Sequence, residues 1–173
     1  SDEQLTVLSA QCIYQFLEAH PDSTKALINN QALPAISKYL VKDKPNSEAA
    51  HYLIKSLEVI STYRPNDVAK EVKISPFLEI FNKLTNLDKK SAAQSMVKVT
   101  ENFVDDTFST SLSELMNMYL TLEDPVKASA ILTFRNIVNK LDDKGKVPIE
   151  IVPQLVDAIN VCNNGTCAIP ILQ

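Results

Sequence analysis

The stretch HPDSTKALINNQALPAISKYL, residues 20–40, contains the helix-breaking residues that decide the fold, and YRPNDVAKEVKISPFLEIFNKL, residues 63–84, repeats their order. In each stretch a proline stops one helix, a short segment follows, and a second proline stands near the start of the next helix. Pro21 and Pro65 are 44 residues apart, and Leu40 and Leu84 are also 44 apart. A period near 43 residues predicts a helical solenoid, in which each unit buries its apolar face against the next unit.

Apolar residues outside these stretches recur at spacings of three and four, as expected for helices. The first helix is predicted to place one apolar set toward the core, namely Leu5, Leu8, Cys12, Ile13, Phe16 and Leu17. Short helices are expected to end at Ile28 and Leu40, and a long helix to begin at Asn46 or Ser47 and end near Tyr63. Its apolar stripe is predicted to consist of Ala50, Leu53, Leu57 and Ile60. Later helices are expected over about 66–73, 75–84, 89–103, 106–120 and 125–141, with another after 148.

The fold class expected from this pattern is all-α, a right-handed α-solenoid of about three full repeats plus partial terminal repeats. We expect one domain, part of a longer protein, with approximate units at 1–20, 21–63, 64–104, 105–141 and 142–173. In the third unit, the first short helix is expected to be reduced to a turn around 105–107. The equivalent positions Val59 and Asn102 are 43 residues apart, and Asn102 and Asn136 are 34 apart.

Composition excludes several classes of protein. The 173 residues include only two glycines, which rules out glycine-rich phosphate loops, and the net charge of −4 argues against nucleic-acid binding. The three cysteines do not form a disulfide framework or a recognisable metal site, so we expect no metal and no cofactor. No apolar run is long enough for a membrane span, and we expect a cytoplasmic or nuclear protein without a membrane partner.

The sequence contains no recognisable pattern of catalytic residues. His20 precedes a proline at a helix end, and His51 lies one turn into a helix near Glu48, without a nucleophile in a recognisable pattern. Both histidines are expected to face solvent or to cap helices. Paired aspartates fall at predicted turns, where they cap helices. We therefore expect no catalytic residues and no enzyme.

Two segments resemble the armadillo repeat family. His20–Ile36 resembles the first and second helices of such a repeat, and Ala130–Val138, AILTFRNIV, resembles its third helix, with Ala130 first, Phe134 four residues later and Asn136 six later. Gln31 stands where the family usually has glycine, and Asn30 is expected to supply the left-handed residue needed there. HEAT-type repeats remain the alternative for the middle units.

The resemblance implies that the third helices line a concave groove, where an asparagine bonds the backbone of a bound segment. That position reads Phe16, Val59, Asn102 and Asn136 along the array, and the position four residues earlier reads Cys12, Lys55, Lys98 and Leu132. Import receptors of the family often carry tryptophan at the earlier position, and this chain contains none. The expected partner-binding residues are Tyr52, Lys55, Val59, Lys98, Asn102, Leu132 and Asn136.

The function expected from these features is a non-enzymatic scaffold or adaptor that holds an extended or helical segment of a partner protein. Lys55 and Lys98 favour an acidic segment. The first alternative is an armadillo-type co-chaperone that promotes nucleotide release from an Hsp70-type ATPase. The second is the regulatory or recruiting domain of a larger protein such as a formin or a ubiquitin ligase. Self-association through uncapped ends is a further expectation.

Overall fold

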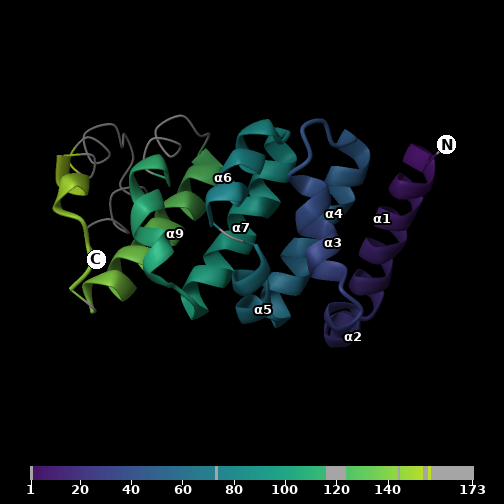
Figure 1. The fold of residues 1–173 in the computed structure, drawn as a ribbon, viewed down its shortest axis with the longest axis horizontal. Coiled ribbons are helices and arrows are strands. Elements are labelled where there is room, and N and C mark those ends of the chain that lie inside the picture. Colours follow the sequence, from purple (N-terminus) through teal and green to yellow (C-terminus); the bar gives the residue numbers. More distant parts are fainter. Residues whose placement is uncertain (1, 73, 116–123, 144, 154–155, 157–173) are drawn as a thin grey trace.

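The chain is all-helical over the residues that the computed structural model describes, which are 2–72, 74–115, 124–143, 145–153 and 156 (Figure 1). Helix α1 lies at one end of the molecule, and the later elements follow in chain order toward the other end. No helix within the described ranges is both long enough and apolar enough to cross a membrane. The all-α class predicted from the sequence is confirmed.

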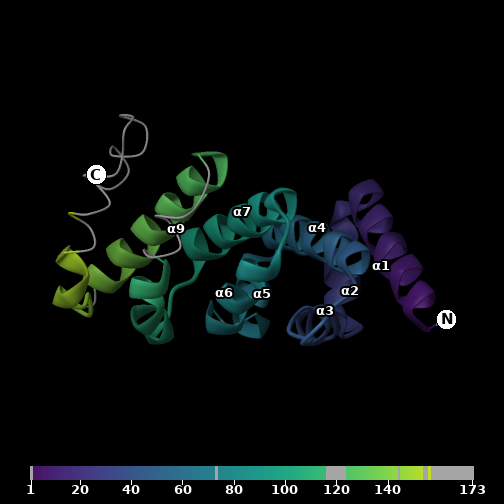
Figure 2. The same cartoon turned by 90° about the horizontal axis from the view of Figure 1, so that it is seen from above.

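The helices form two layers. Four long helices, α1 (Asp2–Ala19), α4 (Ser47–Tyr63), α7 (Asn86–Asn102) and α9 (Asp124–Asp142), pack side by side in chain order. Figure 2 shows the second layer, which contains α2 (Thr24–Asn29), α3 (Ala32–Leu40), α5 (Pro65–Glu71) and α6 (Ile74–Lys83). The described part of the chain also contains short 3₁₀ turns, namely η1 (Pro21–Ser23), η2 (Asp106–Ser111) and η3 (Ile149–Ile151).

Capping residues account for the helix starts. The Asn46 side chain accepts hydrogen bonds from the backbone N–H groups of Glu48 and Ala49, so α4 begins where the sequence predicts. Pro65 occupies the first turn of α5, where its missing N–H group costs nothing. Thr85 caps α7 by accepting from the backbone N–H of Asp88. Helix α7 therefore begins at Asn86, three residues before the predicted start.

One continuous core lies between the layers. The predicted stripe of α4 is confirmed, because all four of its members are buried. The other long helices contribute Ala10 and Leu17, then Ala92, Met96 and Val99, then Ile131, Phe134 and Ile137, and the short helices contribute Leu33, Ile36, Leu40, Val68, Leu78, Ile80 and Phe81.

The prediction for α1 was partly wrong. Leu17 is buried and Ile13 packs against the core, but Leu5, Leu8, Cys12 and Phe16 are exposed. The core-facing side of α1 is centred on Ala10 and Leu17, so these four residues lie on the opposite side of the helix. Helix α1 is apolar on both sides.

The turn between α2 and α3 corrects a second prediction. Gln31, not Asn30, takes the left-handed conformation, with φ of 62°. Asn30 instead closes α2, because its backbone N–H donates to the carbonyls of Ala26 and Leu27 and its side chain donates to Ala26. The chain reversal therefore falls on the next residue.

The later units are described only in part. The turn expected around 105–107 is longer in the structure, because η2 extends it to Ser111. The side chain of Asp105 caps η2 by accepting a hydrogen bond from the backbone N–H of Thr107. Phe108 of η2 is buried. Residues 112–115 are helical. The predicted helix end at Leu120 and most of the expected unit 142–173 lie outside the described residues.

Candidate functional site

The side of the long helices turned away from the core forms a single row of exposed positions. On α4 exposed or half-buried residues recur at spacings of three and four, and they include Glu48, His51, Tyr52, Lys55, Glu58, Val59 and Thr62. The matching residues of α7 are Leu87, Lys90, Gln94, Val97, Lys98 and Glu101, and those of α9 include Ser129, Leu132, Arg135 and Asn136. We call the outward side of α1, α4, α7 and α9 the long-helix face. All seven predicted partner-binding residues lie on these helices at exposed or half-buried positions.

The structure corrects the register of α7 by one helical turn. Helices α4 and α7 both have 17 residues, and their first residues, Ser47 and Asn86, are 39 residues apart, not the 43 that the sequence period suggests. The cause is the connection before each helix, which is residues 41–46 before α4 but only 84–85 before α7. A difference of four residues is about one turn of an α-helix.

Burial confirms this register along the row. Ser56, Ser95 and Thr133 are buried, at intervals of 39 and 38 residues. Leu17 and Ile60, both buried, are 43 apart, so the predicted offset holds between α1 and α4.

The predicted asparagine position therefore reads Phe16, Val59, Lys98 and Asn136. The position four residues earlier reads Cys12, Lys55, Gln94 and Leu132. We call each of these two sets of equivalent positions a column. Compared with the prediction, Lys98 replaces Asn102 in the first column, and Gln94 replaces Lys98 in the second.

Both predicted lysines form ion pairs within their own helices. The Nζ atom of Lys55 lies 3.6 Å from Oε2 of Glu58, and Nζ of Lys98 lies 3.6 Å from Oε2 of Glu101. Such exposed pairs contribute little to stability, so the energetic cost of exchanging the glutamate for another carboxylate is small. Lys98 is about half exposed and Lys55 about a quarter exposed.

The two asparagines differ in their surroundings. Asn102 is exposed, and its Nδ2 donates to the carbonyl of Lys98 in the same helix. Asn136 is half-buried, and its Nδ2 donates across to Oγ1 of Thr100 in α7 at 3.2 Å. Lys140 makes a second link between these helices, because its Nζ donates to the carbonyl of Glu101. These bonds tie α9 to α7 along the long-helix face.

Apolar contact area on the face comes from Tyr52, Val59 and Leu132, all half-buried. The Tyr52 ring lies 6.1 Å from that of Tyr14 and 5.4 Å from that of His51, measured between ring centroids. Tyr52 therefore joins the exposed side of α4 to α1.

A hydrogen-bonded pair between α4 and α7 is not predicted by the sequence analysis. His51 was expected to face solvent or to cap a helix, but its side chain contacts Asp88. Nδ1 of His51 lies 2.6 Å from Oδ1 of Asp88, whose side chain is only 4% exposed. Thr85 donates to the other carboxylate oxygen at 2.9 Å. The spacing of Thr85 and Asp88 is a capping pattern, and it could have marked the start of α7 in the sequence. The pair itself joins residues 37 positions apart, which no local pattern reveals.

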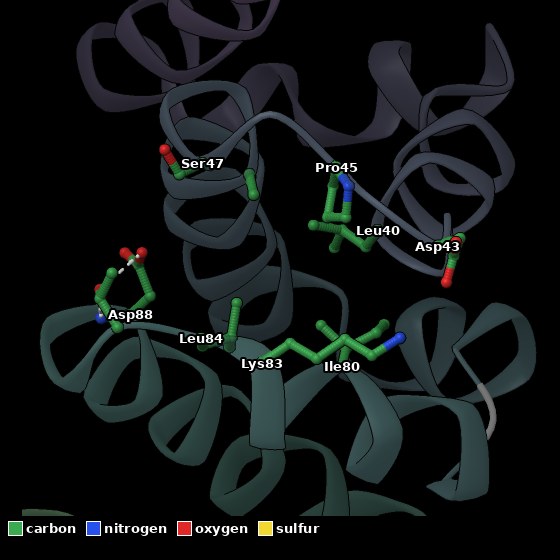
Figure 3. A pocket seen from close by; sticks show the side chains of 10 residues that line it. Leu40, Asp43, Pro45, Ser47, Ile80, Lys83, Leu84 and Asp88 are labelled. Carbon is green, nitrogen blue, oxygen red and sulfur yellow. Dashed lines mark hydrogen bonds between the residues drawn. The ribbon is translucent and has the colours of Figure 1, made fainter.

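A pocket of about 270 Å³ lies where the connections α3–α4 and α6–α7 meet (Figure 3). Asp88 lies at one end, and the Lys83 side chain extends toward Asp43 at the other. The rest of the lining is mostly apolar and consists of Leu40, Pro45, Ser47, Ala50, Ile80, Leu84 and Thr85. The volume is slightly below that of ordinary small-molecule sites, and Asp88 is already engaged by His51 and Thr85. We assign no chemistry to this pocket.

Within the described ranges, no group of three or more His, Cys, Asp or Glu side chains could hold a metal ion.

Comparison of the chain with protein-family models, with curated proteins and with solved structures finds no match. The armadillo resemblance therefore rests on residues 20–36 and 130–138 alone.

Proposed function

We propose that the chain is a non-enzymatic interaction domain, built as a right-handed armadillo-like solenoid of about three full repeats with partial terminal ones. It acts as a scaffold or adaptor in the cytoplasm or nucleus and binds a segment of a partner protein along the long-helix face. One observation carries the proposal: four long helices pack side by side in chain order and leave a single row of outward positions. Such a row is an extended surface, the form that stacked helical repeats use for binding.

The proposed contacts follow the corrected register. Val59, Lys98 and Asn136 form one column, and Lys55, Gln94 and Leu132 form the next. The lysines bind carboxylates of an extended or helical acidic segment by exchanging them for Glu58 and Glu101. The half-buried residues of the face, with Tyr52, supply apolar area. Asn102 lies one helical turn beyond Lys98, so it contacts the partner segment at the edge of the first column.

The experiment is capture of partners from a cell lysate on the immobilised chain, beside the variant Lys55→Glu, Lys98→Glu. Reversing both charges is expected to release the partner, because each lysine would then repel the carboxylates that it binds. The matched control is Lys38→Glu, Lys70→Glu, which makes the same charge change on α3 and α5 in the other layer. Crosslinks from the partner are expected on α4, α7 and α9.

Capture that survives the change in α4 and α7 but is lost with the control would contradict the proposal. Crosslinks spread over a folded ATPase domain would favour the co-chaperone alternative. Circular dichroism of each variant confirms that the helices are retained.

A further inference from the structure

Arg135 on the long-helix face carries a charge that no neighbouring side chain balances. It lies on α9 beside Asn136 and is half-buried. Within the part of the chain that the structure describes, its guanidinium makes no ion pair and no hydrogen bond. A guanidinium carries five N–H donors in a planar arrangement and stays charged in proteins. Arg135 therefore presents an unused anion-binding group on the face to which the partner is proposed to bind.

The local sequence explains why Arg135 has no partner in its own helix. Lys55 and Lys98 each pair with a glutamate three residues later. The four residues that lie three or four positions away from Arg135 carry no charge, and they are Ile131, Leu132, Val138 and Asn139. Because only residues at these spacings are neighbours on a helix surface, α9 supplies no carboxylate to Arg135.

Two other basic residues differ from Arg135 in their surroundings. Nε of Arg64, the other arginine of the chain, lies 2.8 Å from Oδ2 of Asp67, so that charge is balanced within the molecule. Lys90 on α7 makes no ion pair with the described residues, but its side chain is exposed and water solvates its charge. Arg135 is partly removed from water, and a charge in such a position interacts more strongly with an opposite charge than a fully exposed one does.

The corrected register places Arg135 in a third column of the long-helix face. It matches Val97 of α7, which is 38 residues earlier, and Val97 matches Glu58 of α4, which is 39 residues earlier. All three residues are half-buried. Along this column the charge changes from negative on α4, through an apolar residue on α7, to positive on α9.

The net charges of the helices change in the same direction. Helix α4 contains two glutamates and one lysine, for a net charge of −1 with histidine counted as neutral. Helices α7 and α9 each contain three basic and two acidic residues, for a net charge of +1. Opposite charges across an interface favour and orient association, and like charges disfavour it. The acidic residues of a bound segment are therefore favoured over α7 and α9 rather than over α4.

We propose that Arg135 anchors the acidic segment of the partner protein. Its guanidinium binds one glutamate or aspartate carboxylate of the segment through two parallel N–H···O hydrogen bonds, the geometry that arginine and carboxylate groups favour. Unlike Lys55 and Lys98, Arg135 releases no carboxylate of its own helix when it binds the segment. This contact rests on the proposed function, since it belongs to the same face, and it fixes the acidic end of the segment at α9.

The probes are three fluorescently labelled peptides of about twelve residues, which span roughly 40 Å when extended. In each peptide threonine alternates with a second residue, which is glutamate in the first, glutamine in the second and lysine in the third. Fluorescence anisotropy with the full chain is expected to show binding of the glutamate peptide alone. Added salt is expected to weaken this binding, because it screens the charges.

The decisive variants are Arg135→Gln and Arg135→Lys. Arg135→Gln removes the charge and is expected to weaken binding of the glutamate peptide by about tenfold. Arg135→Lys keeps the charge but cannot make two parallel hydrogen bonds, so a loss of about threefold is expected. The matched control is Lys70→Gln, which removes one positive charge from α5 in the other layer and is expected to bind like the original chain.

Equal affinity of Arg135→Gln and the original chain for the glutamate peptide would overturn the proposal. If Lys98→Gln then weakens that binding, the role of Arg135 is wrong while the proposed function stands. Failure of the glutamate peptide to bind better than the lysine peptide would contradict both. Thermal unfolding separates binding from packing, because Arg135 bonds to no described side chain and its variants are expected to melt with the original chain. A clearly lower melting temperature of both variants would assign Arg135 to packing and overturn its role as an anchor.

Discussion

Helices α1 and α4 are neighbours in the same layer and share one burial pattern, yet they present different chemistry outward. Their buried positions agree, as Ala10 and Leu17 of α1 match Leu53 and Ile60 of α4 at an interval of 43 residues. Their outward positions differ: α1 presents leucine, cysteine and phenylalanine where α4 presents glutamate, histidine, lysine and valine. The core positions serve stacking in both helices, whereas the outward positions are free to differ.

The largest expected effect separates the two sides of α1. Leu17→Ala and its equivalent Ile60→Ala should each lower the free energy of unfolding by roughly 2–5 kcal/mol, because both residues are completely buried. Phe16→Ala, one residue from Leu17, should cost less than about 1 kcal/mol because its side chain is half exposed. Urea unfolding followed by circular dichroism measures all three.

The core assignment would be contradicted by a cost for Phe16→Ala as large as that for Leu17→Ala. Such a result would mean that the outward side of α1 is packed and not exposed.

A smaller effect concerns the charges along the seam between the two helices. Tyr14 is expected to ionise above its ordinary pKa of 10.0, and Glu18→Gln should bring that pKa down by removing the negative acceptor. The sign for stability follows from the raised value: the contribution of Tyr14 is fully present below its unfolded pKa and is lost as the pH rises through the folded pKa. Tyrosinate absorbance during an alkaline titration measures the shift.

Glu3→Gln is the control for this titration, because Glu3 lies at the other end of α1 and does not contribute to the shift at Tyr14. A titration of Tyr14 that responds to Glu3→Gln and not to Glu18→Gln would contradict the hydrogen bond to Glu18 as the main cause of the raised pKa.

Local signals in the sequence predicted the first half of the fold well. Asn46 and Pro34 are residues with strong positional preferences, so the start of α4 and the first turn of α3 were located within about two residues. The apolar stripe of α4 followed from helical periodicity alone.

The errors arose where the outcome depended on contacts between elements. The register of α7 was shifted because a connection of two residues replaces one of six, and a repeat period measured on prolines does not detect such a difference. The apolar residues of α1 were assigned to the core because periodicity shows that a helix has an apolar side but not which side is buried. The pair between His51 and Asp88 likewise depends on the packing of two helices.

The most direct test of this account compares equivalent positions on the two helices. The variant Cys12→Gln, Phe16→Gln changes α1, and Lys55→Gln, Val59→Gln changes the matching positions of α4. We expect the second variant to capture less of the partner from a cell lysate, because the proposed contacts lie on α4, α7 and α9, and the first variant to capture it like the original chain. Equal capture by the two variants, or a loss only in the α1 variant, would contradict the claim that the partner binds at Lys55 and Val59.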